Sequence, residues 1–407
     1  MGDYCSMSNS TDMIQKRIDA YTDRVSRLKS EDLYFYNQPV EEIVGGSKVV
    51  VNGRQMDMFA SYSYLGLVGH PRINKAAQLA VARYGTGTHG VRTLAGSPVL
   101  HNELEEMLAQ FKHAEEAVTF TSGYVTNLSV ISTLIARGDI VYCDKLNHAS
   151  IYDGCLLSRA KFERFEHNDL HDLEERLSTA PAASAKLVVV DAVFSMDGDL
   201  IDLPAIVALC KKYHAWLMVD EAHSLGVLGK SGSGIEEHFG IPGSIDIKMG
   251  TLSKTIPSVG GYVAGRKDLI NYIRHAARGY IFSAALPPAQ AAAALEALHV
   301  IVDEPLRIKK LKNNSSRFID GLKNAGLDTM LTETAIVPVL CGEDDTAFAM
   351  TREAQHQQIF VLPVVSPAVP QGLARLRATV TAAHEDDAID HAIEVIAESA
   401  HKLGVLK

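Results

Sequence analysis

Three short apolar runs, each typical of a buried strand, end in residues that could do chemistry. Residues 245–249 lead into Gly250-Thr251-Leu252-Ser253-Lys254, residues 216–219 into Asp220-Glu221-Ala222-His223, and residues 187–193 into Phe194-Ser195-Met196-Asp197. Ligands of open α/β sheets bind outside the carboxyl ends of the strands. We therefore expect an amine, a carboxylate, an imidazole and several hydroxyls to meet at one edge of a sheet.

This combination of groups fits pyridoxal 5′-phosphate (PLP). An amine forms a Schiff base with its aldehyde, and a carboxylate keeps its pyridine nitrogen protonated, so that the ring accepts electrons. Hydroxyls and the N–H groups at the start of a helix suit its phosphate. The residues that would serve the aldehyde, the pyridine nitrogen, the phenolic oxygen and the phosphate are, in turn, Lys254, Asp220, His223 or Ser195, and Thr251 with Ser253.

A second phosphate contact is predicted in the loop Thr121-Ser122-Gly123-Tyr124, which follows a predicted strand and precedes a helix expected from Asn127. Each of these residues alone has an ordinary explanation. An acidic residue after a strand is usually a helix cap, and so is a Thr-x-Ser pair. Their coincidence at successive strand ends favours a cofactor site.

The sequence resembles the α-oxoamine synthase family of fold-type I PLP enzymes from about residue 62 to residue 384. That family includes 8-amino-7-oxononanoate synthase, 2-amino-3-ketobutyrate CoA ligase, 5-aminolevulinate synthase and serine palmitoyltransferase. The motifs that carry the resemblance are Asp246-Ile247-x-x-Gly250-Thr251-Leu252-Ser253-Lys254 with Gly260-Gly261-Tyr262, Val219-Asp220-Glu221-Ala222-His223-Ser224-x-Gly226, Tyr64-Leu65-Gly66-Leu67, Asp144-x-x-Asn147-His148-Ala149-Ser150, Phe194-Ser195-Met196-Asp197-Gly198 and Arg375-Leu376-Arg377.

The resemblance implies a decarboxylative Claisen condensation of an amino acid with an acyl thioester, which gives an α-aminoketone, CO2 and a free thiol. Lys254 would then carry the cofactor and remove the Cα proton, while Asp220 pairs with the pyridine nitrogen. His148 would stack on the ring, and His223 with Ser195 would bind the phenolic oxygen.

The resemblance also implies the remaining ligands. Thr251 and the backbone of Ser122, Gly123 and Tyr124 would hold the phosphate, joined by Ser283 from the neighbouring subunit of a homodimer. Arg375 would grip the amino-acid carboxylate, for which a planar guanidinium is well suited. The remaining predicted substrate contacts are Arg92, near the substrate entrance, and Ser63, where several members carry a substrate-binding Asn.

Substrate choice is only loosely constrained. The entrance segment Thr88-His89-Gly90-Val91 is crowded, which favours glycine, alanine or serine, and the donor is acyl-CoA or an acyl-carrier protein. Thr255-Ile256-Pro257 departs from the family pattern after Lys254. Two alternatives are another fold-type I PLP activity, such as an aminotransferase, and a cofactor-free regulatory subunit, which would be expected to lack Lys254.

Bulk properties narrow the class of protein. The 407 residues carry a formal net charge of −10 with no long basic run, which argues against nucleic acid and anionic membranes as main partners. The five cysteines form no C-x-x-C pair, and no metal-binding spacing is present, so a reduced, cytoplasmic setting is expected. No apolar stretch is long enough to span a membrane. The G-x-G-x-x-G at residues 85–90 follows a predicted helix, so it does not indicate a dinucleotide site.

The elements that must position these residues indicate an α/β protein. Apolar strands alternate with helices between residues 117 and 264, which predicts a mostly parallel sheet, seven-stranded in the resembled fold, with helices on both faces. We expect an N-terminal helix and a hairpin turning at Asn52-Gly53 in residues 1–60, a large PLP-binding domain in 61–290 and a smaller α+β domain in 291–407.

Overall fold

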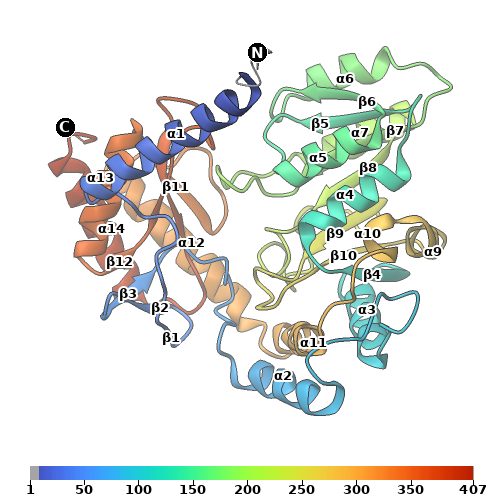
Figure 1. The fold of residues 1–407 in the computed structure, drawn as a ribbon, viewed down its shortest axis with the longest axis horizontal. Coiled ribbons are helices and arrows are strands. Elements are labelled where there is room, and N and C mark those ends of the chain that lie inside the picture. The colour runs from blue at the N-terminus through green and yellow to red at the C-terminus, as the bar shows by residue number, and fades with distance from the viewer. Residues whose placement is uncertain (1–8, 407) are drawn as a thin grey trace, which may run out of the picture.

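A computed structural model describes residues 9–406 of the chain. Its centre is a seven-stranded sheet in the order β4-β10-β9-β8-β7-β5-β6 (Figure 1). The strands are β4 (Glu116–Phe120), β5 (Ile140–Asp144), β6 (Lys161–Phe165), β7 (Lys186–Asp191), β8 (Trp216–Asp220), β9 (Ile247–Thr251) and β10 (Gly261–Gly265). Only the two pairs made by β10 are antiparallel. The predicted mostly parallel sheet is therefore confirmed.

Alternate residues of the central strands enter two separate cores, because successive side chains point to opposite faces of a sheet. Val188 and Val190 belong to one core and Leu187 and Val189 to the other. The helices on the first face are α2 (Pro71–Tyr84), α3 (Val99–Phe111), α6 (Leu170–Ser178), α7 (Leu203–Tyr213), α8 (Ile235–Phe239) and α11 (Pro288–Asp303). Those on the second face are α4 (Gly123–Leu134), α5 (Ala149–Ser158), α9 (Lys267–Ala276) and α10 (Arg278–Ile281).

A smaller unit lies beside the large sheet (Figure 1). Its three-stranded antiparallel sheet has the order β11-β14-β13, formed by β11 (Ile336–Gly342), β14 (Ala374–Thr379) and β13 (Leu362–Val364). A third core joins this sheet to α12 (Leu306–Asn324), α13 (Asp344–His356) and α14 (Asp386–Lys402).

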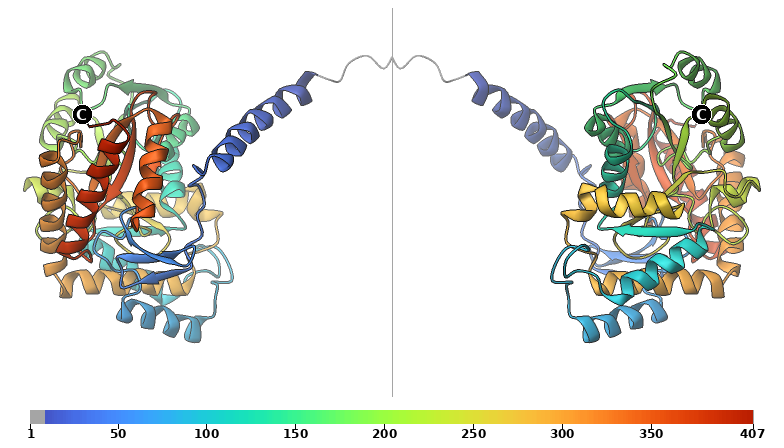
Figure 2. Two further views of the ribbon diagram at one scale, coloured as in Figure 1. Left: turned by 90° about the vertical axis from the view of Figure 1, so that its left-hand side faces the viewer. Right: turned by 90° about the vertical axis from the view of Figure 1, so that its right-hand side faces the viewer.

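The N-terminal segment packs on this smaller unit. The hairpin of β2 (Lys48–Val51) and β3 (Arg54–Met58) turns at Asn52 and Gly53, whose positive φ angles of 51° and 68° suit a tight hairpin turn. It is flanked by β1 (Glu42–Val44) and by β12 (Ile359–Phe360), which pairs with β3 in parallel. Helix α1 (Asn9–Ser30) buries Leu28 in the core of the smaller unit, and its other end extends away from the body (Figure 2).

Three local predictions differ from the structure, and one strand was missed. Helix α4 begins at Gly123 rather than Asn127, because Ser122 caps it and accepts a hydrogen bond from Val125 N. Strand β9 continues to Thr251. Trp216, expected in a buried run, is 40% exposed at the start of β8. The edge strand β6 was not predicted, because its sequence Lys-Phe-Glu-Arg-Phe carries three charged residues.

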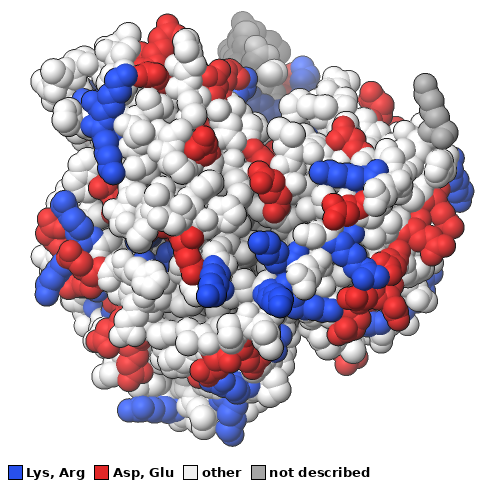
Figure 3. All heavy atoms as spheres, turned by 180° about the vertical axis from the view of Figure 1, so that it is seen from behind, with Lys and Arg blue, Asp and Glu red and all other residues white. Residues whose placement is uncertain are grey.

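The surface carries both signs of charge. Figure 3 shows acidic and basic side chains interspersed over the face opposite that of Figure 1. Within residues 9–406, no helix combines the length and the apolar character that a membrane span requires.

Candidate active site

A cavity of about 260 Å³ opens where the loops after the large-sheet strands converge. It contains most of the residues predicted for the cofactor, which come from segments as far apart in the chain as Ser122 and Lys254. These residues are Ser122, Gly123, Tyr124, His148, Ser195, Asp220, His223, Thr251, Ser253 and Lys254. Lys254 and Asp220 thus line one cavity, as bracketing a single pyridine ring requires.

The amine of Lys254 meets an imidazole rather than a carboxylate. Its Nζ lies 2.8 Å from His223 Nε2, and His223 Nδ1 lies 2.6 Å from the hydroxyl of Tyr64. Burial lowers the pKa of Lys254 to about 8, against the opposing charges of Asp220 and Asp191. Burial and the Lys254 charge lower the pKa of His223, so this imidazole is neutral and takes part in a chain of three groups.

Asp220 stands at the carboxyl end of β8, in register with Asp191 of β7. Asp220 Oδ2 accepts a hydrogen bond from Asn127 Nδ2 at 2.8 Å, and Oδ1 accepts from Ala222 N at 2.9 Å. Burial, followed by the charge of Asp220, raises the pKa of Asp191 well above its usual range. The cavity floor therefore holds two adjacent carboxyl groups with different environments.

His148 approaches the cavity from the loop after β5. Its Nδ1 accepts from Ser150 N at 3.2 Å, which leaves Nε2 to carry the proton of the neutral ring. Its backbone N–H donates to Asp191 Oδ2 at 2.8 Å. Burial lowers the pKa of His148. A neutral, flat imidazole is therefore held at the cavity wall by contacts at its backbone and at its inner nitrogen.

The opposite end of the cavity combines a helix start with two hydroxyls. Ser122 caps α4, and Thr251 Oγ1 lies 2.9 Å from Ser253 Oγ. At Gly123, an added Cβ would lie 3.1 Å from Thr251 Oγ1, so a larger residue would crowd this end. The exposed N–H groups of a helix start, together with hydroxyls, form a suitable phosphate site.

Four predicted residues lie outside the cavity. Arg92 is buried against Glu105 at 2.6 Å, and Ser283 lines a separate surface hollow beside Arg92. Ser63 is buried, and its Oγ accepts a hydrogen bond from Val68 N at 3.4 Å. Arg375 is buried, and its Nη1 lies 2.6 Å from Asp197 Oδ1. Their predicted roles stay predictions.

Several residues of the site had no role assigned from sequence. Asn127 and Asp191 line the cavity, and Tyr64 extends the chain from Lys254 through His223. The Tyr62 ring lies 5.6 Å from Lys254 Nζ and 4.9 Å from the Arg377 guanidinium. A signal was available only for Tyr64 and Arg377, which belong to motifs that resemble the family.

The donor set fits PLP. It supplies an amine of lowered pKa, a carboxylate, a flat imidazole and a phosphate cradle around one cavity. Asn127 Oδ1, beside Asp220, is buried and lacks a hydrogen-bond partner within the described residues. An unsatisfied polar atom of this kind, with acid and amine nearby, is expected where a polar ligand completes the site.

Comparison with known proteins gives a consistent set of relatives. Residues 55–396 match the family Aminotransferase class I and II. The chain is 45% identical over 388 residues to 8-amino-7-oxononanoate synthase of Geobacter sulfurreducens, with 94% of this chain and 98% of that protein aligned. It is 43% identical over 370 residues to serine palmitoyltransferase of Sphingobacterium spiritivorum, with 91% and 92% aligned.

Solved structures agree with the sequence relatives. A structure of serine palmitoyltransferase with PLP superposes with a TM-score of 0.93 at 33% identity, over 96% of this chain and 99% of that chain. An 8-amino-7-oxononanoate synthase from Francisella tularensis superposes with a TM-score of 0.74 at 27% identity, over 85% and 98%. The fold of both structures, and the PLP of the serine palmitoyltransferase structure, match the fold and the cofactor predicted from the motifs around Lys254.

Proposed function

The chain belongs to the α-oxoamine synthase family of PLP-dependent acyltransferases, and we propose that the cavity around Lys254 is its active site. The reaction of this family condenses an amino acid with an acyl thioester and releases CO2 and a free thiol. The observation that carries the proposal is that Lys254 and Asp220 line the same cavity and that burial lowers the pKa of Lys254 to about 8.

Each end of the cavity suits one part of PLP, which when bound stabilises negative charge at the Cα of the amino acid. Asp220 would hold the pyridine nitrogen, and Lys254 would attach to the aldehyde. His148 would cover the ring face. Ser195 and His223 would bind the phenolic oxygen. The phosphate ligands would be Ser122, Gly123, Tyr124, Thr251 and Ser253, with Ser283 from a second subunit.

Proton transfer falls to Lys254. An amine with a pKa of about 8 is uncharged in about one molecule in ten at pH 7, whereas an ordinary lysine is almost fully protonated. The free amine takes the Cα proton of the amino acid as a general base and returns it later. Neutral His223, 2.8 Å away, keeps the nitrogen of Lys254 directed into the cavity.

Two arginines can receive the substrate carboxylate. Arg375 was predicted for this role and is paired with Asp197. Arg377 donates through Nε to Ser195 O at 2.7 Å, and its Nη2 is buried without a hydrogen-bond partner within residues 9–406. We propose that the carboxylate binds between them, with Arg377 supplying the unused donor.

We propose glycine, alanine or serine as the amino acid and acyl-CoA or an acyl-carrier protein as the donor, with Arg92 and Ser63 near the entrance. A homodimer would bring Ser283 of one subunit to the phosphate of the other. A cytoplasmic setting is supported by four buried free cysteines, Cys143, Cys155, Cys210 and Cys341.

The test is a thiol-release screen with the PLP-loaded protein. Glycine, alanine and serine are each combined with short and long acyl-CoAs, and free CoA and CO2 are measured. We expect amino-acid-dependent release of both for at least one combination, and none with Lys254→Ala. Conversion of the amino acid to a keto acid without thiol release would overturn the proposal in favour of an aminotransferase.

A further inference from the structure

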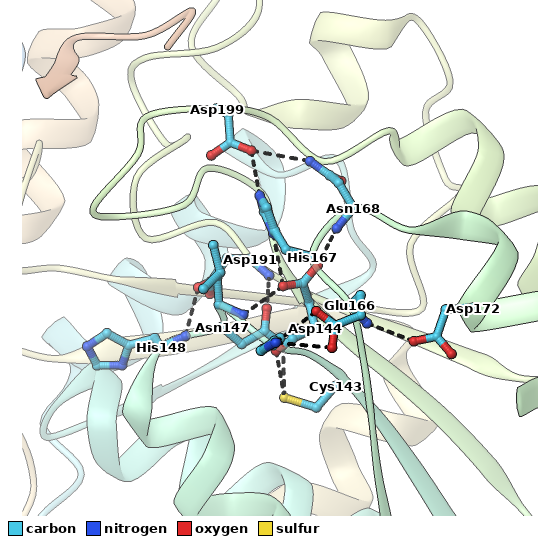
Figure 4. A network of polar contacts seen from close by, with 12 residues as sticks. Cys143, Asp144, Asn147, His148, Glu166, His167, Asn168, Asp172, Asp191 and Asp199 are labelled. Carbon is cyan, nitrogen blue, oxygen red and sulfur yellow. Dashed lines mark hydrogen bonds and ion pairs between the residues drawn. The ribbon is translucent and has the colours of Figure 1, made fainter. Parts of the chain in front are cut away.

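A histidine outside the cavity lies between two carboxylates. His167 follows β6, and its Nδ1 is 3.0 Å from Asp144 Oδ1 while its Nε2 is 2.8 Å from Asp199 Oδ2. Figure 4 shows the imidazole between these two acidic side chains. Both ring nitrogens have a carboxylate partner, so the contacts require a proton on each nitrogen. His167 is therefore an imidazolium ion that joins two segments of the chain.

One partner leads to His148. Asp144 ends β5, and it accepts hydrogen bonds from Leu146 N at 2.8 Å and Asn168 N at 2.9 Å in addition to His167. The next residues, up to His148, form the loop that brings its ring to the cavity. Asn147 extends the network, because its Nδ2 donates to Val189 O at 2.7 Å and its Oδ1 accepts from Asp191 N at 2.9 Å. We call residues 144–148 the His148 loop.

The other partner leads to Ser195. Asp199 closes the loop of residues 194–199, in which Phe194 N donates to Asp199 O at 3.1 Å. The His167 ring also packs edge-on against Phe194, with centroids 4.3 Å apart. This segment, the Ser195 loop, contributes Ser195 to the cavity and Asp197 to Arg375.

The charge on His167 is set by its neighbours. Burial alone would lower the pKa of His167, but hydrogen bonds to Asp144 and Asp199 and the charges of both raise it to about 10. The other acidic groups near His167 already have ion-pair partners. Glu166 pairs with Lys145 at 2.8 Å, and Asp172 pairs with Arg176 at 2.7 Å. No group of residues within 9–406 has the arrangement of a metal site.

We propose that His167 is a positioning residue for catalysis, which as an imidazolium bridge between Asp144 and Asp199 fixes the His148 loop and the Ser195 loop relative to each other. The two loops present their side chains to one cavity. A shift of either would move His148 or Ser195 relative to the cofactor ring. This inference rests on the proposed placement of PLP between those residues.

The test uses two variants and one matched control. In His167→Gln, the amide can donate to one carboxylate but presents an oxygen to the other, so the bridge opens. Asp199→Asn weakens only the contact to the Ser195 loop. His171→Gln makes the same chemical change at an exposed histidine four residues further on, at the start of α6.

Hydrogen–deuterium exchange of the cofactor-free protein is the first measurement. We expect faster exchange in peptides covering residues 144–148 and 194–199 of His167→Gln, with no change in the β8 peptide. Asp199→Asn should loosen only residues 194–199, and His171→Gln neither segment. Equal acceleration throughout the chain would show a purely structural role and overturn the proposal.

The second measurement is the PLP dissociation constant from the visible absorbance of the loaded protein. We expect an increase of about 10–100-fold for His167→Gln, by analogy with the loss of residues that orient the ligands of a metal, and less than about twofold for His171→Gln. An unchanged constant in His167→Gln would overturn the proposal. If the wild type fails to bind PLP, the proposed active site is refuted, while the exchange data still decide whether His167 couples the two loops.

Discussion

Two lysines six residues apart have different surroundings, which suit one to a structural role and the other to the chemistry that we propose for it. Lys248 lies within β9, and Lys254 lies in the loop that follows it. Lys248 is 3% exposed, pairs with Glu236 at 2.7 Å and donates to Lys112 O at 3.0 Å. The Nζ of Lys254 lies 2.8 Å from His223 Nε2, and among residues 9–406 it forms no ion pair with a carboxylate.

The difference lies in the partners and not in burial alone. The buried ammonium of Lys248 has a carboxylate and a carbonyl as partners, so its loss of hydration is compensated by an ion pair and a hydrogen bond. A buried ammonium next to a neutral imidazole is not compensated, and its pKa falls. The pair Lys112–Glu221, also 2.7 Å apart, follows the first pattern, and Glu221 is the residue after Asp220. Of these buried lysines, the one that we propose to carry the cofactor is the one that lacks a direct counter-ion.

The largest expected effect is on turnover. Lys254→Ala should reduce thiol release by about 10⁴-fold or more, because it removes both the attachment point and the base. Its free energy of unfolding in urea should fall by less than about 1 kcal/mol, since a poorly compensated buried amine contributes little to stability. If Lys254→Ala lost stability as well as activity, Lys254 would also have a structural role, and it would no longer differ from Lys248 in this respect.

The reverse result is expected at Lys248. Lys248→Met should lower the free energy of unfolding by about 3–5 kcal/mol, because it leaves Glu236 buried without its partner. Molecules that remain folded should still bind PLP with the normal visible spectrum. Urea unfolding and absorbance of the same sample measure both properties. Unchanged stability would contradict the assignment of Lys248 to structure.

The third prediction concerns protonation. In cofactor-free protein, reductive methylation at pH 7 should modify the Lys254 amine about 300-fold faster than an ordinary exposed lysine of equal access, since their pKa values differ by about 2.5. The rate for Lys254 should reach half its maximum near pH 8. Peptide mass spectrometry gives the rates, and a midpoint near 10.5 would refute the lowered pKa.

The same pKa has a consequence for stability. Between pH 8 and about 10.5 the unfolded chain binds more protons at this lysine than the folded chain, so Lys254 makes the cofactor-free protein more stable as the pH rises. His167 acts in the opposite direction. Its raised pKa stabilises the fold fully below about pH 6.5, and this contribution is lost as the pH rises through about 10.

The smallest effect is expected at Tyr64, whose hydroxyl meets His223. Tyr64→Phe should reduce kcat by about 5–30-fold. It removes one buried hydrogen bond, worth roughly 1–2 kcal/mol, and so frees the His223 imidazole that faces Lys254. Tyr262→Phe is the matched control. The Tyr262 hydroxyl is buried with no partner within the described residues, so its removal should leave kcat within about twofold. Equal effects of both substitutions would show that Tyr64 acts by packing alone.

Much of the fold could be predicted from the sequence. Strands such as β7 and β8 have continuous apolar sequences, and Asn52-Gly53 specifies its hairpin directly. The edge strand β6 could not be recognised, because an edge strand exposed to solvent tolerates charged residues and loses the apolar pattern.

Candidate site residues could be predicted from the sequence where they directly follow a strand. They could not be predicted where their place in the site depends on a neighbour from another segment. That Asp220 and Lys254 line one cavity could be expected from their positions alone. Asp191 and Asn127 could not be expected there, since their importance arises from a register and a helix start that bring them to Asp220. Likewise, nothing in the sequence indicates that Arg92 faces Glu105.

The contact between Arg375 and Asp197 means that a carboxylate of the protein competes with the carboxylate of the amino acid for the Arg375 guanidinium. In the proposed site, an incoming carboxylate exchanges one ion pair of the guanidinium for another instead of adding a new one. Binding strength then reflects the difference between two similar pairs, which keeps affinity modest and largely insensitive to ionic strength. Because Asp197 and Arg375 belong to different units of the molecule, that exchange also releases a tether between them.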